Sequence, residues 1–218
     1  MRATQTKQVT VTGALIVSVA APPKGYTGIA ITANANWAGS NGPFDGVFHW
    51  GDGAYSIINT ANKSISKTHT YASAGTYTIR VEITDRNTNA RGEDTDTIQI
   101  AAKLSATLSP SPSSGDAPLP VSFSIGINGG YPAYSWSLNP GDGSTSYSGT
   151  RLTPGTITKA HTYSKVGTFS AKLTVTDTLG ASMVTETSIM SGIMLEQEAI
   201  IILGSAATGL ALFIYGTR

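Results

Sequence analysis

The chain carries one stretch of sequence twice. Residues 69–85 read HTYASAGTYTIRVEITD, and residues 161–177 read HTYSKVGTFSAKLTVTD. Both copies keep a histidine, a tyrosine two places later, a Gly-Thr-aromatic triplet and a final Thr-Asp, all at the same spacing. After the triplet, apolar and polar residues alternate, a pattern that predicts a β-strand with one buried face. The sequence therefore predicts the same strand in two places.

A second shared motif lies upstream of each copy. Gly51-Asp52-Gly53 precedes the first histidine and Gly141-Asp142-Gly143 precedes the second, and only the spacing in between differs, by two residues. An aspartate between glycines can accept backbone N–H groups and close a turn, while glycine supplies positive φ. The repeating unit is roughly 90 residues long, the size of a whole small β-domain.

Alternation predicts further strands on both sides of these motifs. In the first copy they are expected at 9–20, 28–36, 44–50 and 95–101, and in the second at 104–108, 119–127, 133–138 and 183–190. About seven short strands per copy predict an all-β chain of two tandem antiparallel β-sandwiches. The predicted domains are 1–102 and 103–191, with the boundary at Ala102-Lys103, and such a short linker favours a semi-rigid rod. The Ser/Pro-rich stretch 109–115 is expected to be a loop.

Composition excludes several classes of function. Only 12% of the 218 residues are charged and the net charge is +1, which gives no bulk basic surface for nucleic acid. The chain has no cysteine, so disulfides, cysteine–zinc sites and thiol nucleophiles are excluded.

The last segment differs in kind from the rest of the chain. Residues 199–215 contain no charge and no proline over seventeen positions, the lower limit for a helix that spans a bilayer. Small residues that would let helices approach closely are Gly204, Ser205, Thr208 and Gly209. We expect residues 192–218 to form a C-terminal hydrophobic helix, with the lipid bilayer as partner of 199–215. A helix buried in an assembly and a final strand are the alternatives.

The N-terminal segment permits two interpretations. Residues 14–21 form a short apolar run behind Arg2 and Lys7, and Val19-Ala20-Ala21 resembles a weak signal-peptide cleavage site. The apolar positions also fall at strand spacing, which favours the alternative that this run is a β-strand.

The ordered series of motifs resembles the PKD domain, an Ig-like β-sandwich, over about residues 7–190. Matching stretches of the second copy are 117–123, 134–136, 166–169 and 173–177; the segment 137–140 makes its Trp-to-Gly spacing two residues longer than usual. In the first copy, Phe48 is expected to take the place of the family's tryptophan. Residues that match the family's motif are Trp50, Asp52, His69, Tyr71 and Asp85 in the first copy and Trp136, Asp142, His161, Tyr163 and Asp177 in the second. The resemblance implies an interaction or spacer module without a shared active site.

Few residues suggest chemistry of their own. His69 and His161 have no convergent cluster near them in sequence, so we expect each to anchor its strand by packing and hydrogen bonding, and His49 to be partly buried beside Trp50. No metal or other cofactor is expected; calcium is the alternative, because Asp85, Asp94, Asp96 and Asp177 lie at or near turns, although calcium prefers six to eight oxygens.

Catalysis is not expected. No nucleophile elbow accompanies any Ser-His-Asp combination, and the 13 acids show no paired arrangement for glycoside hydrolysis. Four tyrosines in expected loops either pack in turns or stack on sugars: Tyr26, Tyr55, Tyr131 and Tyr147.

These observations predict a non-enzymatic structural protein. A chain that keeps its N-terminus and has one apolar segment at its C-terminus leaves its bulk on the side where it is made, whereas PKD modules normally face outward. A capsid-associated component of a membrane-containing virion satisfies both conditions, with other structural proteins or copies of itself as partners. The alternatives are a cell-surface adhesion or S-layer-type protein with 1–21 as signal, and a carbohydrate-binding accessory module that takes glycans.

Overall fold

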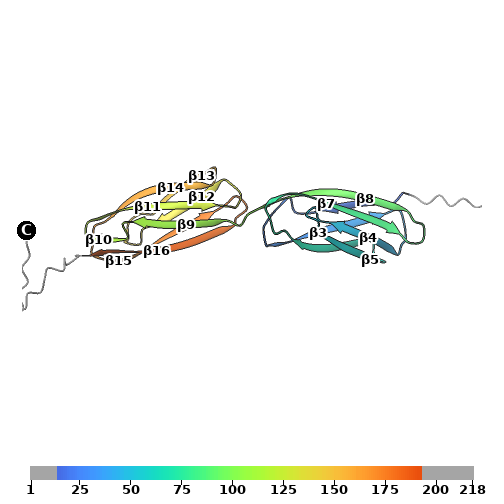
Figure 1. Ribbon diagram of the computed structural model, residues 1–218, viewed down its shortest axis with the longest axis horizontal. Coiled ribbons are helices and arrows are strands. Elements are labelled where there is room, and N and C mark those ends of the chain that lie inside the picture. The colour runs from blue at the N-terminus through green and yellow to red at the C-terminus, as the bar shows by residue number, and fades with distance from the viewer. Residues whose placement is uncertain (1–13, 193–218) are drawn as a thin grey trace, which may run out of the picture.

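The structure is a computed structural model that describes residues 14–192. These residues form two β-sandwiches joined end to end, as Figure 1 shows. Each sandwich contains eight strands in one three-stranded and one five-stranded sheet. We call the sandwich of strands β1–β8 module 1 and that of strands β9–β16 module 2.

Module 1 pairs its strands in the orders β1-β3-β6 and β2-β8-β7-β4-β5. All neighbours are antiparallel except β2 and β8, which are parallel. The strands are β1 (Ile16–Ala20), β2 (Lys24–Tyr26), β3 (Ala30–Ala38), β4 (Phe44–His49), β5 (Tyr55–Thr60), β6 (Ser64–Thr70), β7 (Gly75–Asp85) and β8 (Arg91–Ala101).

Module 2 repeats this arrangement. Its sheets have the orders β14-β11-β9 and β10-β16-β15-β12-β13, and β10 with β16 is again the parallel pair. The strands are β9 (Ser105–Ser111), β10 (Ser114–Asp116), β11 (Leu119–Asn128), β12 (Tyr134–Asn139), β13 (Tyr147–Arg151), β14 (Gly155–Tyr163), β15 (Gly167–Thr176) and β16 (Ser182–Gly192).

Alternation along the repeated stretch builds both cores. Ile79, Val81 and Ile83 of β7 are buried in module 1, and Leu173 and Val175 of β15 are buried in module 2. The intervening residues point to solvent, because successive side chains of a strand lie on opposite faces. The buried residues fall into two separate clusters, one for each module. The predicted all-β, Ig-like sandwich architecture is confirmed.

Several details differ from the sequence-based expectations. The stretch expected to be a loop at 109–115 is mostly strand: β9 continues through Pro110 to Ser111, and β10 follows at Ser114. A proline fits here because β9 is an edge strand. The apolar run 14–21 contributes strand β1, and Leu15 and Val17 are buried in the core, so the strand interpretation holds for these residues.

The predicted C-terminal helix, with Gly204, Ser205, Thr208 and Gly209, lies outside the described residues. Within 14–192 no helix is long and apolar enough to cross a membrane.

Candidate functional site

The repeated Gly-Asp-Gly segments form the same turn in both modules. Asp52 Oδ1 accepts the backbone N–H of Ala54, and Asp142 Oδ1 accepts that of Ser144, each at 3.0 Å. The first glycine of each motif has a φ of 84°, a conformation that favours glycine. A Cβ at Gly51 would also lie 2.6 Å from the backbone oxygen of Thr78, so the turn packs tightly against β7.

Each turn is tied to the strand that carries the histidine. Nε2 of His69 lies 2.7 Å from Oδ2 of Asp52, and Nε2 of His161 lies 2.8 Å from Oδ2 of Asp142. His69 also stacks on Trp50, with ring centroids 4.9 Å apart. In this way a side-chain contact joins a turn to a strand seventeen to nineteen residues away.

The motif tyrosines complete the connection. The Tyr71 hydroxyl donates to the Trp50 carbonyl oxygen at 2.8 Å, and the Tyr163 hydroxyl donates to that of Pro140 at 2.9 Å. Both tyrosines are fully buried, and burial together with the nearby aspartate charge raises the pKa of each to about 12. These hydroxyls therefore remain protonated donors across the physiological range.

The motif aspartates are held as carboxylates. Burial alone would raise the pKa of Asp142, but hydrogen bonds from Ser144 and His161 outweigh it and lower the pKa to about 2. The pKa of Asp52 is lowered in the same way, by bonds from His69 and Ala54 that outweigh burial. This arrangement fixes a turn, and its polar groups are used in bonding within the module.

That Phe48 takes the place of the family's tryptophan stays a prediction, but within this chain Phe48 does not share the position of Trp136. Strand pairing places Trp136 opposite Val175 in module 2, and the equivalent pair in module 1 is Gly46 opposite Ile83. Phe48 pairs with Val81, two residues further along the ladder. Phe48 and Trp136 therefore occupy different places in the two modules, because strand register sets which side chains share a place.

His49 also differs from its expected position. It is exposed, with a side-chain accessibility of 48%, and its Nε2 lies 3.5 Å from Glu82 Oε1. It occupies the outward face of β4, while its neighbours Phe48 and Trp50 point inward. Residues 14–192 contain no group of three or more His, Asp or Glu side chains placed to hold a metal ion.

The junction between the modules brings together residues that are far apart in sequence. The Tyr26 hydroxyl, from the end of β2, donates to Asp177 Oδ2 of module 2 at 2.7 Å. The same oxygen accepts the backbone N–H of Tyr131 at 2.9 Å, and the two tyrosine rings meet edge to face at 5.5 Å between centroids. Desolvation first, and the bond to Asp177 second, raise the pKa of Tyr26.

Tyr131 makes the reverse connection from module 2 to module 1. Its hydroxyl lies 3.0 Å from the carbonyl oxygen of Gly25 and 2.5 Å from that of Gln99, and its side chain is buried. The ammonium of Lys24 lies 4.8 Å from the centre of its ring. The two tyrosines thus cross the junction in opposite directions, and each reaches a polar group of the other module.

The other tyrosines divide between packing and exposure. The hydroxyl of Tyr147 lies 3.1 Å from Nδ1 of His161 in a partly buried position, while Tyr55 on β5 is 65% exposed. Sequence reasoning missed the junction. The available signal was a difference between the copies: Lys24-Gly25-Tyr26 of β2 corresponds to Ser114-Gly115-Asp116 of β10, so the tyrosine is not repeated.

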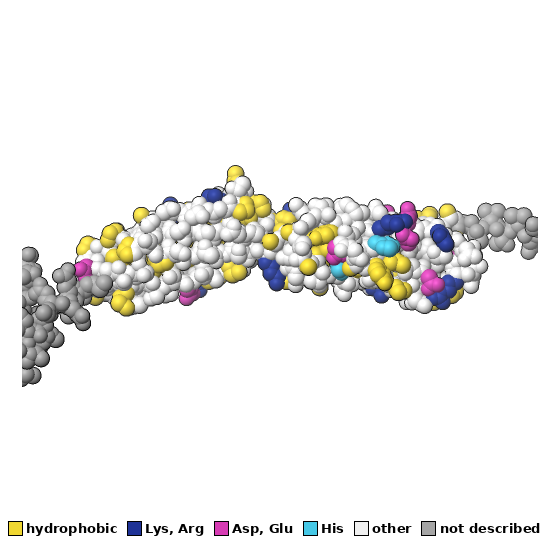
Figure 2. All heavy atoms as spheres, viewed as in Figure 1, with side chains coloured by type: hydrophobic (Ala, Val, Ile, Leu, Met, Phe, Trp, Pro, Cys, Tyr) yellow, Lys and Arg dark blue, Asp and Glu magenta, His cyan; other side chains and the backbone are white. Residues whose placement is uncertain are grey.

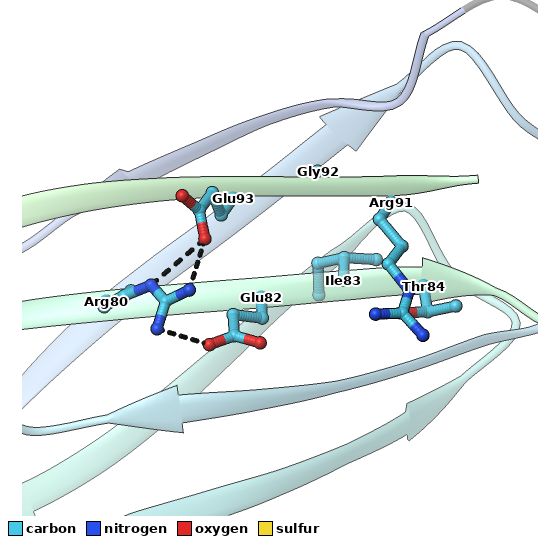
Figure 3. Close-up of a pocket in the computed structure, with 7 residues that line it drawn as sticks. All are labelled: Arg80, Glu82, Ile83, Thr84, Arg91, Gly92 and Glu93. Atoms are coloured by element: carbon cyan, nitrogen blue, oxygen red, sulfur yellow. Dashed lines mark hydrogen bonds and ion pairs between the residues drawn. The ribbon is translucent and has the colours of Figure 1, made fainter. Parts of the chain in front are cut away.

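The outer face of the five-stranded sheet differs between the modules. In module 1 a shallow pocket of about 260 Å³ lies over β7 and β8, where Arg80 sits between Glu82 and Glu93, as Figure 3 shows. Figure 2 shows charged, histidine and apolar side chains gathered on this module. On the corresponding sheet of module 2, Lys172 of β15 pairs with Glu186 of β16.

Two sheets of three and five strands with Ig-like packing make each module an Ig-like β-sandwich, a class whose members are typically non-catalytic. The family model for the PKD domain matches residues 105–188. Module 2 is the part of the chain that matches this model, and module 1 shares its strand order and its repeated motif.

Three solved structures are similar to this chain. The PKD domain of an M14-like peptidase from a Thermoplasmatales archaeon is 22% identical over 39% of this chain and 92% of its own, with a TM-score of 0.34. A variant of titin domains I67–I69 is 11% identical over 82% of this chain and 66% of its own (TM-score 0.52). The three N-terminal domains of the highly immunogenic outer capsid protein Hoc of bacteriophage RB49 are 13% identical over 83% of this chain and 71% of their own (TM-score 0.44). No curated protein matches this chain significantly.

Proposed function

We propose that this protein is a non-enzymatic structural component of a membrane-containing virion. In this proposal two PKD-type modules form a semi-rigid rod that holds module 1 at a fixed distance from an anchor in residues 199–215. PKD and Ig-like domains commonly serve in structural or adhesion proteins and mediate protein–protein interaction.

The contacts at the junction between the two modules are the observation that supports a semi-rigid rod. Asp177 accepts one hydrogen bond from Tyr26 of module 1 and one from Tyr131 of its own module, and the Tyr131 hydroxyl lies within bonding distance of Gly25 and Gln99. Only three residues, 102–104, separate β8 from β9. Short linkage and reciprocal bonds both oppose bending, because a large rotation would break the Tyr26–Asp177 bond and separate the Tyr131 hydroxyl from its carbonyl partners.

Spin labelling tests the rod directly. The chain has no cysteine, so Thr68→Cys and Ser188→Cys place two labels on exposed strand positions of the two modules without background. Double electron–electron resonance on the full chain in mild detergent should give one narrow distribution of the distance between the two labels. A broad distribution would mean that the modules move freely, and the rod would have to be abandoned.

The virion setting rests on the N-terminal strand. Leu15 and Val17 belong to the core of module 1, and β1 pairs with β3 along its full length. Removing residues 1–21 as a signal would delete this strand, which supports a chain that retains it. The cell-surface alternative with residues 1–21 as signal would lose this strand.

Fractionation separates the two settings. We expect the native protein to co-purify with lipid-containing particles, with residues 14–21 present in its mature chain by N-terminal mass spectrometry. Recovery from the outer face of uninfected cells, starting after Ala21, would instead support the cell-surface protein.

A further inference from the structure

We propose that strand β5 of module 1 pairs with β5 of a second copy of this chain. The two strands run antiparallel about a two-fold axis at Ile57, so that two five-stranded sheets become one continuous sheet. This inference names a partner surface and does not depend on the virion setting.

Strand β5 is an open sheet edge. It is hydrogen-bonded only to β4, and in an antiparallel ladder alternate residues direct their N–H and C=O groups away from the partner. Its outward side chains include Tyr55 and Ile57, which are 65% and 66% exposed. An edge that offers both free backbone groups and apolar side chains is a template for another strand.

The other edges among the described residues each carry a feature that opposes pairing. Strands β2 and β10 are three residues long, and β1 has the backbone N–H groups of Val19 and Ala21 bonded to Asp94 and Asp96. The remaining edges contain Lys67 in β6, Pro110 in β9, Arg151 in β13 and Lys159 in β14. Strand β5, with the sequence YSIINT, has no charge, no proline and no glycine. Charges, prolines and short length are the means by which proteins protect edges, and β5 uses none of them.

A two-fold axis at Ile57 matches like with like. In module 1, Val47 of β4 faces Ile57 of β5, so the axis places the four side chains Val47, Ile57, Ile57 and Val47 in one row across both copies. In the next row Tyr55 of one copy faces Asn59 of the other. That row ends in His49 of one copy and Asp45 of the other.

Module 2 lacks this surface. Its equivalent edge, β13, has the sequence YSGTR, and its outward residues are Ser148 and Thr150. The proposal therefore predicts pairing through module 1 alone.

Cysteine cross-linking tests the register. Residues directly opposite in an antiparallel pair have Cα atoms about 4.5–5.5 Å apart, within the range of about 4.4–6.8 Å that a disulfide needs. Ile57→Cys in the full chain, in mild detergent, should form a disulfide dimer on mild oxidation at least tenfold faster than Ser148→Cys, the matched edge control in module 2. Tyr55→Cys alone should not cross-link, because its two copies lie about 14 Å apart along the strands. Mixed Tyr55→Cys and Asn59→Cys chains should form the heterodimer.

A charge on the edge provides a second measurement. Ile57→Lys should abolish the dimer in sedimentation velocity, while Val184→Lys on the exposed face of β16 should leave it intact. Equal cross-linking of Ile57→Cys and Ser148→Cys would overturn the proposal, and so would a heterodimer that forms no faster than the Tyr55→Cys homodimer. A chain that stays monomeric but binds a glycan or a foreign strand at β5 would assign the edge to that occupant and reject the second copy.

Discussion

Module 1 and module 2 carry the same motif aspartate at the same end of the sandwich, which we call the pole. The groups that donate hydrogen bonds to this aspartate differ between the two modules. Asp85 of module 1 accepts hydrogen bonds from the Ser40 hydroxyl and from the N–H of Gly42, both in its own module. Asp177 of module 2 accepts the Tyr26 hydroxyl from the other module. The same carboxylate is thus hydrogen-bonded within its own module in module 1, whereas in module 2 it also bonds across the junction to the other module.

A single position accounts for this difference. Ser40 follows Gly39 and Gly130 follows Gly129, and a Cβ at either leading glycine would collide with the backbone of the preceding segment, at Ala14 or at Lys103. A Cβ at Gly130 would lie 2.8 Å from Asp177 Oδ2. Because Gly130 has no side chain, the Tyr26 hydroxyl has room to reach Asp177. In module 1 the serine at the equivalent place, Ser40, bonds the aspartate itself.

The two cores also differ in which of two paired strands carries the large side chain. Trp136 faces Gly149 across β12 and β13, whereas Gly46 faces Ile58 across β4 and β5. The bulk moves from one strand to the next, and both Trp136 and Ile58 are buried. Fold conservation at this point therefore depends on a pair of positions, and neither residue alone defines it.

The largest loss of stability should come from removing the buried tryptophan of module 2. Trp136→Ala leaves a cavity opposite Gly149 and should destabilise module 2 by about 3–5 kcal/mol, without changing module 1. Urea unfolding monitored separately for each module by hydrogen exchange measures this. Equal destabilisation of both modules would contradict independent cores, and Ile58→Val, at about 0.5–1.5 kcal/mol, is the control in module 1.

Removing a hydrogen bond to the aspartate at either pole should have the next largest effect. Ser40→Ala and Tyr26→Phe each remove one hydrogen bond to a carboxylate, worth about 1.5–3 kcal/mol. The first should lower the stability of module 1, and the second should broaden the inter-module distance distribution while each module stays folded. Tyr77→Phe serves as control, since the Tyr77 hydroxyl donates to the Ser73 carbonyl oxygen within module 1 and not across the junction. If Tyr26→Phe keeps the narrow distribution, the hydroxyl does not hold the junction.

The motif tyrosines should behave alike in both modules. Tyr71→Phe and Tyr163→Phe leave a buried carbonyl oxygen unpaired, at a cost of about 1–3 kcal/mol each. Differential scanning calorimetry should show one transition lowered in each variant, by similar amounts. A much smaller loss in one module would show that its Gly-Asp-Gly turn is fixed by other contacts.

Acid should give the smallest change near neutrality. The folded-state pKa of Asp142 is about 2, below an unfolded value of about 3.9. The folded state therefore binds fewer protons, so the stability contributed by this group is complete above about pH 4 and is lost as pH falls toward 2. Asp142→Asn should flatten the decline of the urea midpoint between pH 4 and 2, and an unchanged slope would contradict the assignment.

The sequence predicted the sandwich because local patterns determine it. Alternation in 79–83 and 171–175 assigns inward faces without any knowledge of partners. The junction and the tryptophan exchange escaped prediction because both depend on tertiary pairing: Tyr26 and Asp177 are 151 residues apart, and Gly46 matches Trp136 only once the register of β4 against β7 is known. His49 was misplaced for the same reason, since one step of register moves a side chain to the other face.

Asp116 stands in β10 where Tyr26 stands in β2. Aspartate lacks the phenol group with which Tyr26 reaches Asp177, so the tyrosine contact of the junction has no copy at this end of module 2. The two modules therefore share a fold but present different ends to a neighbour, and a further module next to β10 would need contacts other than those of this junction.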